Sequence, residues 1–229
     1  MITPFDESYK KTKDIKDSIK TIEPRYNNFV NWLEKTYVKP INIFCDVIGT
    51  FNKRRPRIEI ILEFKNDLKE YKLDDITKHN IQGNLKEEIL KAFKEMVDEP
   101  LFRKFNKKRN YNFLKETILN IGIFEDIAKQ DIIINIKQEE IDKLMEQLNN
   151  PELWTISRNF SRTVFFVYTE EQLQKYKNDN IIKEWTEKYI EIIKQYDEYN
   201  YFKGCYEINL DSKENFDKTH ESSWFYYYR

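Results

Sequence analysis

The stretch RIEIILEFKND, residues 57–67, largely alternates apolar and polar side chains, as is typical of a β-strand with one buried face. One face would carry Ile58, Ile60, Leu62 and Phe64, and the other Glu59, Ile61, Glu63 and Lys65. A second β-like run, INIFCDVIGTF at 41–51, precedes it across the connection NKRRP. Gly49 and Pro56 mark the turn, so we predict an antiparallel hairpin of strands 41–51 and 57–65.

Beyond the hairpin, apolar side chains at three- and four-residue steps predict several amphipathic helices. The predicted helices span 6–22, 25–38, 85–97, 112–121, 137–150 and 179–197, with a short one after Thr169. Further strands are predicted at 131–136, 153–157, 163–168, 205–210 and 222–229, with 66–83 as an irregular connection. These elements predict an α+β fold in which a mostly antiparallel sheet is packed by amphipathic helices.

Length and composition predict one domain over residues 1–229, with any subdivision a weak one near 99–112. The 16 Phe, 15 Tyr and 4 Trp supply enough apolar area to offset chain entropy. The 39 Lys and Arg against 40 Asp and Glu give a net charge of -1, so no overall field attracts nucleic acid or anionic lipid. Only four glycines are present, and none forms a phosphate-binding motif, so we expect no cofactor.

The sequence also predicts a cytoplasmic location. No run approaches the roughly 18 apolar residues of a membrane helix, and the first residues lack the apolar core of a secretory signal. Cys45 and Cys205 are too few for a disulfide framework or a zinc site, which favours a reducing compartment. We therefore expect no membrane partner and no metal site.

Asp46, Glu63 and Lys65 raise one enzymatic alternative. An acid followed by acid-x-lysine on neighbouring strands resembles the core of restriction-endonuclease-like nucleases. The resemblance covers only these three residues, and Asp46 lacks the proline that precedes the first acid in that family. It implies that the two acids bind Mg²⁺ and that the lysine activates water. In the other interpretation these groups form a solvated sheet face, and Asp46 pairs with Arg57 or Lys65 across the hairpin.

Two basic stretches favour nucleic-acid binding, because guanidinium groups can neutralise phosphates beside aromatic rings that stack on bases. The candidate contacts are Lys53, Arg54, Arg55 and Arg57 in the first stretch, and Lys107, Lys108 and Arg109 in the second. The alternative is that both stretches are solubilising loops.

The C-terminal stretch SSWFYYYR offers a candidate protein interface. In the predicted strand, Trp224, Tyr226 and Tyr228 share one face, and Tyr and Trp suit interfaces because each combines a large apolar area with a polar group. The alternative is a central strand buried under helices on both sides.

No catalytic signature accompanies His79 or His220, since neither belongs to a recognisable triad. The leading hypothesis is therefore a cytosolic, non-enzymatic protein that binds another macromolecule, most plausibly a protein, as bacterial immunity or antitoxin-like proteins do. The alternative is a Mg²⁺-dependent nuclease that uses Asp46, Glu63 and Lys65. The sequence leaves homo-oligomerisation open.

Overall fold

The computed structural model describes residues 3–50, 54–103, 111–177 and 181–229. The chain divides into two compact units, Met1–Ile127 and Ala128–Arg229, each with its own three-stranded sheet. The boundary lies inside helix α6 (Phe124–Asn135) rather than near 99–112. Whether residues 1–229 act as a single domain stays a prediction.

The first unit builds a mixed sheet in the order β1-β2-β3. Its elements are α1 (Glu7–Lys16), η1 (Pro24–Tyr26), α2 (Asn27–Thr36), β1 (Asn42–Ile48), β2 (Arg55–Leu62), η3 (Lys65–Tyr71), α3 (Gly83–Met96), α5 (Phe113–Glu116) and β3 (Ile118–Ile123). The predicted hairpin is confirmed, because β1 and β2 pair antiparallel with Asp46 opposite Arg57. The helix predicted at 112–121 is present only as α5, and its second half is wrong because β3 begins at Ile118 and pairs in parallel with β2.

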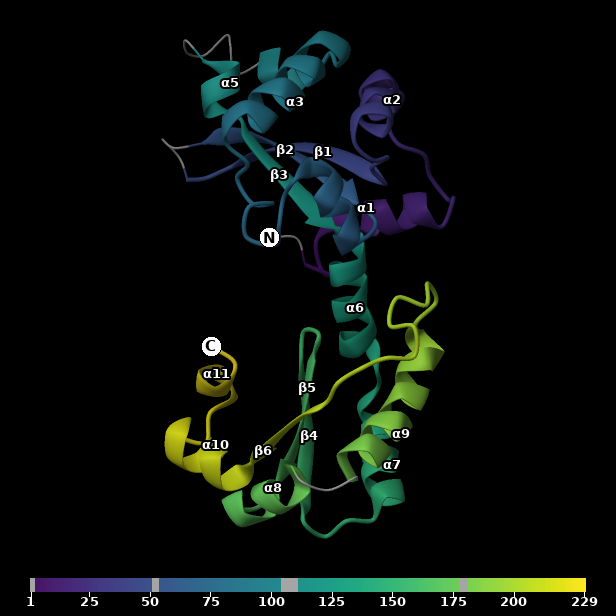
Figure 1. The fold of residues 1–229 in the computed structure, drawn as a ribbon, viewed down its shortest axis with the longest axis vertical. Coiled ribbons are helices and arrows are strands. Elements are labelled where there is room, and N and C mark those ends of the chain that lie inside the picture. Colours follow the sequence, from purple (N-terminus) through teal and green to yellow (C-terminus); the bar gives the residue numbers. More distant parts are fainter. Residues whose placement is uncertain (1–2, 51–53, 104–110, 178–180) are drawn as a thin grey trace. The chain divides into compact units, whose positions relative to one another are not determined.

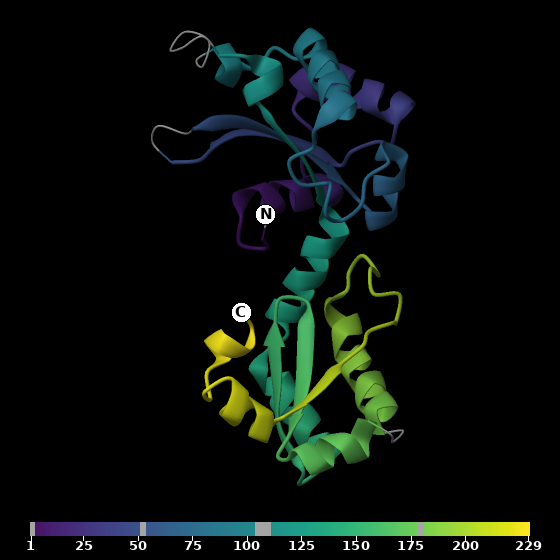
Figure 2. The same ribbon diagram turned by 60° about the vertical axis from the view of Figure 1, so that its left-hand side comes forward.

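Helices cover both faces of this sheet, as the two ribbon views agree (Figures 1 and 2). Helices α2 and α3 pack on one face, and α1 lies on the other. The first face is apolar and includes Phe29, Leu33, Ile58, Ile60, Phe93, Leu119 and Ile121. The second face carries polar contacts, because Asn42 of β1 donates a hydrogen bond to Thr12 of α1 over 3.2 Å. The central strand β2 is therefore covered from both sides.

The second unit repeats this arrangement, with a mixed sheet in the order β4-β5-β6. Its elements after α6 are α7 (Gln138–Leu148), β4 (Leu153–Asn159), β5 (Arg162–Val167), α8 (Glu170–Lys177), α9 (Ile181–Tyr196), β6 (Asn209–Ser212), α10 (Lys213–Thr219) and α11 (Trp224–Tyr227). The strands predicted at 153–157 and 163–168 are confirmed as the antiparallel pair β4-β5, and the short helix predicted after Thr169 is α8, where Thr169 and Gln172 form a capping box. Strand β6 pairs in parallel with β5.

The central strand β5 is also buried on both faces. Phe165 contacts Trp185 and Tyr189 of α9, with ring centroids 5.6 and 5.9 Å apart. On the opposite face, Phe166 packs against Phe216 of α10 and Tyr227 of α11. Each unit is thus a thin sheet between two layers of helix.

Two predicted strands are wrong. Residues 131–135 lie in α6, and Ile132, Ile133 and, just beyond the helix end, Ile136 are buried at helical spacing. Residues 224–227 form the short helix α11, because Trp224 and Tyr227, three residues apart, both pack on Phe216. The α+β class is confirmed, but each sheet joins one antiparallel and one parallel pair of strands.

Within the described ranges, no helix is both long and apolar enough to span a lipid bilayer.

Replacing Phe165 with Ala should remove a fully buried ring and leave a cavity beneath α9. We expect Phe165→Ala to lower the free energy of unfolding by about 3–5 kcal/mol in urea denaturation. Phe225→Ala is the matched control, because this ring is 70% exposed, and its effect should stay within about 0.5 kcal/mol. Equal losses in the two variants would contradict the described core.

Candidate functional site

Asp46 is held by a bidentate pair with the arginine opposite it. The Nε and Nη2 atoms of Arg57 donate to the two carboxylate oxygens of Asp46 over 2.9 and 2.6 Å. This fork-to-carboxylate geometry is the strongest form of charged hydrogen bond in proteins. The expectation that Arg57 is the cross-strand partner of Asp46 is met.

Glu59, two residues along β2, is a more unusual carboxylate. Its side chain is 6% exposed and lies 3.2 Å from Arg57 Nη1. Its Oε2 atom is the one fully buried side-chain oxygen or nitrogen without a hydrogen bond in the part of the chain that the structure describes. Burial raises the pKa of Glu59, and the nearby Arg57 opposes that shift. The sheet face under α1 therefore carries a desolvated charge cluster.

The structure does not bring Asp46 and Glu63 together. Glu63 follows β2 six residues beyond Arg57, the residue opposite Asp46. At about 3.3 Å of rise per residue, this spacing places the two acids roughly 20 Å apart along the strand. A Mg²⁺ ion bonds oxygen over only about 2 Å, so one ion cannot join the two. Glu63 instead pairs with Lys16 of α1 over 2.5 Å.

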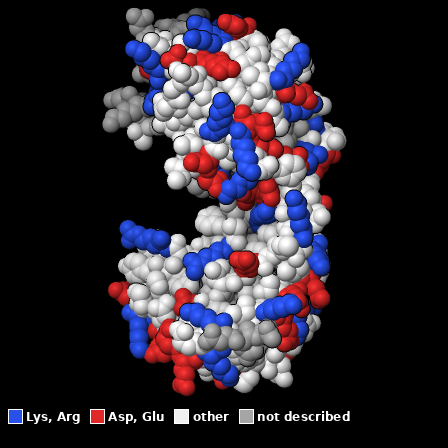
Figure 3. Space-filling view, in the orientation of Figure 1, with Lys and Arg blue, Asp and Glu red and all other residues white. Residues whose placement is uncertain are grey.

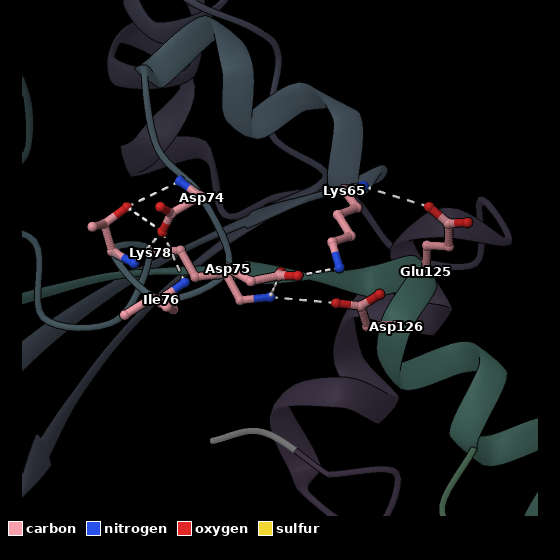
Figure 4. A network of polar contacts seen from close by, with 8 residues as sticks. Lys65, Asp74, Asp75, Ile76, Lys78, Glu125 and Asp126 are labelled. Carbon is pink, nitrogen blue, oxygen red and sulfur yellow. Dashed lines mark hydrogen bonds and ion pairs between the residues drawn. The ribbon is translucent and has the colours of Figure 1, made fainter. Parts of the chain in front are cut away.

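Lys65 belongs to a separate charge network at the start of η3 (Figure 4). Its amine pairs with Asp75, and Asp75 also pairs with the buried Lys78 over 3.0 Å. Lys78 reaches Asp126 at the start of α6 over 3.3 Å. Hydrogen bonds donated by Lys65 and Lys78 lower the pKa of the Asp75 carboxyl group. These contacts tie the loop before α3 to α6, which is a structural role.

No metal site is evident in the described ranges, since no group of three or more His, Cys, Asp or Glu side chains is placed to hold an ion. Nor does Cys45 offer an activated nucleophile, because burial raises the pKa of its thiol to about 12. Charges of both signs are interspersed on the face shown in Figure 3.

The basic residues of the hairpin differ in their contacts. Arg57 is committed to Asp46 and Glu59, as described above. Arg54 is exposed, and Arg55 donates from Nε to the carbonyl oxygen of Glu116 over 2.8 Å. The other candidates for nucleic-acid contact, Lys53, Lys107, Lys108 and Arg109, lie outside the described residues.

Four of the exposed aromatic side chains in the second unit form what we call the aromatic surface: Phe160, Trp224, Phe225 and Tyr226. Phe160 forms the turn between β4 and β5, and the others belong to α11. Phe160 and Trp224 line one groove of about 390 Å³ together with Ser157 and Arg158. Tyr228 differs from the sequence-based expectation, because it is partly buried and donates to Ser157 over 2.7 Å.

Three arginines border the aromatic surface. The Nη1 atom of Arg158 donates to the carbonyl oxygen of Ile136 over 2.6 Å. Arg162 lies over the ring of Tyr227, and Arg229 over that of Phe225. None of the three forms an ion pair with a carboxylate of the described chain. Exposed rings and unpaired guanidinium groups therefore share one surface.

Sequence reasoning missed Phe160, Phe225 and these arginines. Phe225 could be identified as an outward side chain only if residues 224–227 were predicted as a helix. In a strand, residues 224, 226 and 228 share a face, whereas in a helix 224, 227 and 228 do. The helix turns its inner residues onto Phe166 and Phe216 and leaves Phe225 and Tyr226 outward.

A larger groove of about 700 Å³ lies in the first unit. Tyr37 and Tyr71 line it as a stacked pair with centroids 4.5 Å apart, and Glu88 and His79 stand beside them. Its charged lining side chains are exposed and of both signs, so it favours no single class of ligand.

The desolvated cluster around Glu59 can be tested by the pH dependence of the free energy of unfolding in a Glu59→Gln variant. Burial raises the pKa of Glu59 in the folded state above its usual 4.5. Between the unfolded and the folded pKa, the folded state therefore binds more protons than the unfolded state, and the free energy of unfolding falls as pH rises. Glu59→Gln should flatten this fall and match or exceed wild-type stability at neutral pH, as measured by urea denaturation. Glu95→Gln, an exposed change on α3, should leave the wild-type profile intact. A steeper fall in the Glu59→Gln variant would contradict the assignment.

No protein-family model matches this chain, and neither the curated proteins nor the solved structures contain a match.

Proposed function

We propose that this chain is a non-enzymatic binding protein that engages an acidic segment of another protein through the aromatic surface of the second unit. The observation that carries the proposal is the exposure of neighbouring rings in α11: Phe225 at 70%, Tyr226 at 48% and Trp224 at 40%. Large aromatic side chains dominate the binding energy of protein interfaces when they are desolvated by a partner.

Charge favours an acidic partner. Arg162 and Arg229 have no carboxylate partner within the described residues, so their guanidinium groups are available for charge-assisted hydrogen bonds, whereas Arg158 adds positive charge but is held by backbone carbonyls and Gln138. Arg is itself enriched at interfaces, and complementary charge increases the rate of association. An acidic segment would satisfy the arginines while its apolar side chains cover the rings.

Ring geometry favours a protein over a nucleic acid. Stacking on bases requires an open aromatic face. Trp224 stacks on Trp154 at 6.1 Å and on Tyr228 at 6.0 Å, with interplanar angles of 10° and 22°. Arg229 lies over the ring of Phe225. The surface therefore presents ring edges and partly covered faces, which suit apolar side chains.

This mode of action is that of immunity or antitoxin-like proteins, which work by occupying a partner. A cytoplasmic location is part of the proposal. It agrees with the balanced charge of 39 basic and 40 acidic residues, which leaves recognition to local patches.

Removing the outward rings should abolish capture of the partner. We expect the double variant Phe225→Ala and Tyr226→Ala, and separately Arg162→Ala, to lose a stoichiometric partner that the wild-type chain retains from its native host. By calorimetry with the purified partner, loss of a central aromatic should cost about 2 kcal/mol or more, roughly 30-fold in affinity.

Tyr168→Ala is the matched control for that experiment. Tyr168 is 45% exposed but follows β5, six residues from Arg162 and about 20 Å along the strand. It should bind like wild type. Equal binding by the double variant, recovery of no stoichiometric partner, or sedimentation showing that the surface only joins two copies of this chain would each overturn the proposal.

A further inference from the structure

The groove of about 390 Å³ in the second unit follows one edge of strand β4. Four consecutive residues of β4, 155–158, line it, whereas β5, which is described over its full length, contributes none. The sheet order β4-β5-β6 leaves this edge of β4 without a neighbouring strand in the part of the chain that the structure describes. The groove therefore lies where a further strand of the sheet would lie.

Side chains from both faces of β4 reach this groove. Ile156 belongs to the core beneath α9, whereas Ser157 accepts a hydrogen bond from Tyr228 on the opposite face. Ile133 of α6, which shares the core with Ile156, also lines the groove, as does Trp224 of α11. A groove on one face of a sheet would be lined by alternate residues of the strand. Lining by successive residues places this one along the strand edge.

The register of the hairpin shows which backbone groups face the groove. A two-residue turn follows Asn159, so the backbone of Asn159 bonds to β5, as does that of every second residue before it. Thr155 and Ser157 therefore pair with β5, whereas the N–H and C=O groups of Ile156 and Arg158 point into the groove. Within the described ranges these groups have no other hydrogen-bond partner.

This edge lacks the features by which proteins usually block unpaired strands. Strand β4 contains no Lys or Pro, and the irregularity in its register lies before residue 155. Arg158 turns its charge onto the carbonyl oxygens of Ile133 and Ile136. At the end of the groove, Phe160 has a positive φ of 50°, which is unfavourable for a bulky residue and is typical of functional positions.

We propose that the acidic segment of the partner binds in this groove as an extended strand that pairs with the free edge of β4. This inference rests on the proposed function and adds the conformation in which the segment is recognised. In strand addition, backbone hydrogen bonds supply affinity and alternate side chains supply specificity. Here alternate side chains of the segment would meet Trp224 on one face and Ile133 on the other.

Charge favours an acidic segment over a second copy of this chain. Residues 153–169 include Arg158 and Arg162 but no Asp or Glu, although the chain has 40 of these acids in 229 residues. Pairing of two β4 edges would place the same unbalanced positive charge on both strands, and like charges across paired strands are destabilising. Carboxylates on an incoming strand would balance it.

The test adds two capped octapeptides to the full chain, one alternating Glu with Val and the other alternating Lys with Val. Only the acidic peptide should bind. At ten times its dissociation constant it should slow amide exchange of Ile156 and Arg158 about tenfold, as measured by NMR. The amides of Thr155 and Ser157 are the matched control, because they already pair with β5 and should change little.

N-methylation of the acidic peptide tests the backbone pairing without changing this chain. Methylating every Glu nitrogen removes the donors from one edge of the extended peptide, and methylating every Val nitrogen removes them from the other. One modification should weaken binding about 30-fold, through the loss of two backbone hydrogen bonds, and the other should have little effect. Equal effects of the two modifications would contradict strand addition.

Strand addition is also overturned if the acidic peptide does not bind, if the Lys peptide binds equally well, or if the amides of Ile156 and Arg158 stay unprotected. Protection of these amides in the free chain that rises with its concentration would assign the edge to a second copy instead. A native partner that requires Phe225 and Tyr226 but leaves these amides unprotected would overturn strand addition and leave the proposed function standing. Peptide protection that persists in the Phe225→Ala and Tyr226→Ala double variant would support the edge pairing and contradict the role of the aromatic surface.

Discussion

Burial of the central strand on both faces is the constraint on which each unit depends. A sheet of three strands has one strand, β2 or β5, with neighbours on both edges, and both of its faces must be removed from water. The helices of each unit cover these faces. In the first unit α2 and α3 cover one face and α1 the other, and in the second unit α9 covers one face and α10 and α11 the other. Side chains that remain exposed after this coverage are the ones available for binding.

The same constraint explains why the hairpin resembles a catalytic motif. Charged residues on a covered sheet face must be paired, because an isolated buried charge is very unfavourable. Arg57 therefore lies between Asp46 and Glu59, and Glu63 pairs with Lys16 of the covering helix. Glu63 and Lys65 both lie beyond the end of β2 and pair with different partners, Lys16 and Asp75, so their acid-x-lysine spacing does not form one site. Glu59 is the exception whose oxygen lacks a hydrogen bond, and its altered pKa reflects burial.

Sequence patterns predicted local structure well and tertiary pairing poorly. Both hairpins followed from alternation, and α7 and α9 from their apolar stripes. Strand β3 was missed because Leu114, Ile118 and Ile121 also have helical spacing, and a parallel partner 61 residues away leaves no local signal. The aromatic tail shows the same effect, since strand propensity was overridden by packing on Phe216. Because a strand was predicted there, Tyr228 was assigned to the binding face and Phe225 was not identified as exposed.

Hydrogen–deuterium exchange of the free chain and of its complex with the captured partner tests the central claim most directly. In the free chain, amides of β2 and β5 should exchange slowest, because both faces of these strands are covered. On complex formation, new protection should appear at the turn around Phe160 and across residues 222–229, with the hairpin of β1 and β2 unchanged. Protection confined to residues 42–65, with none at the aromatic surface, would contradict the account.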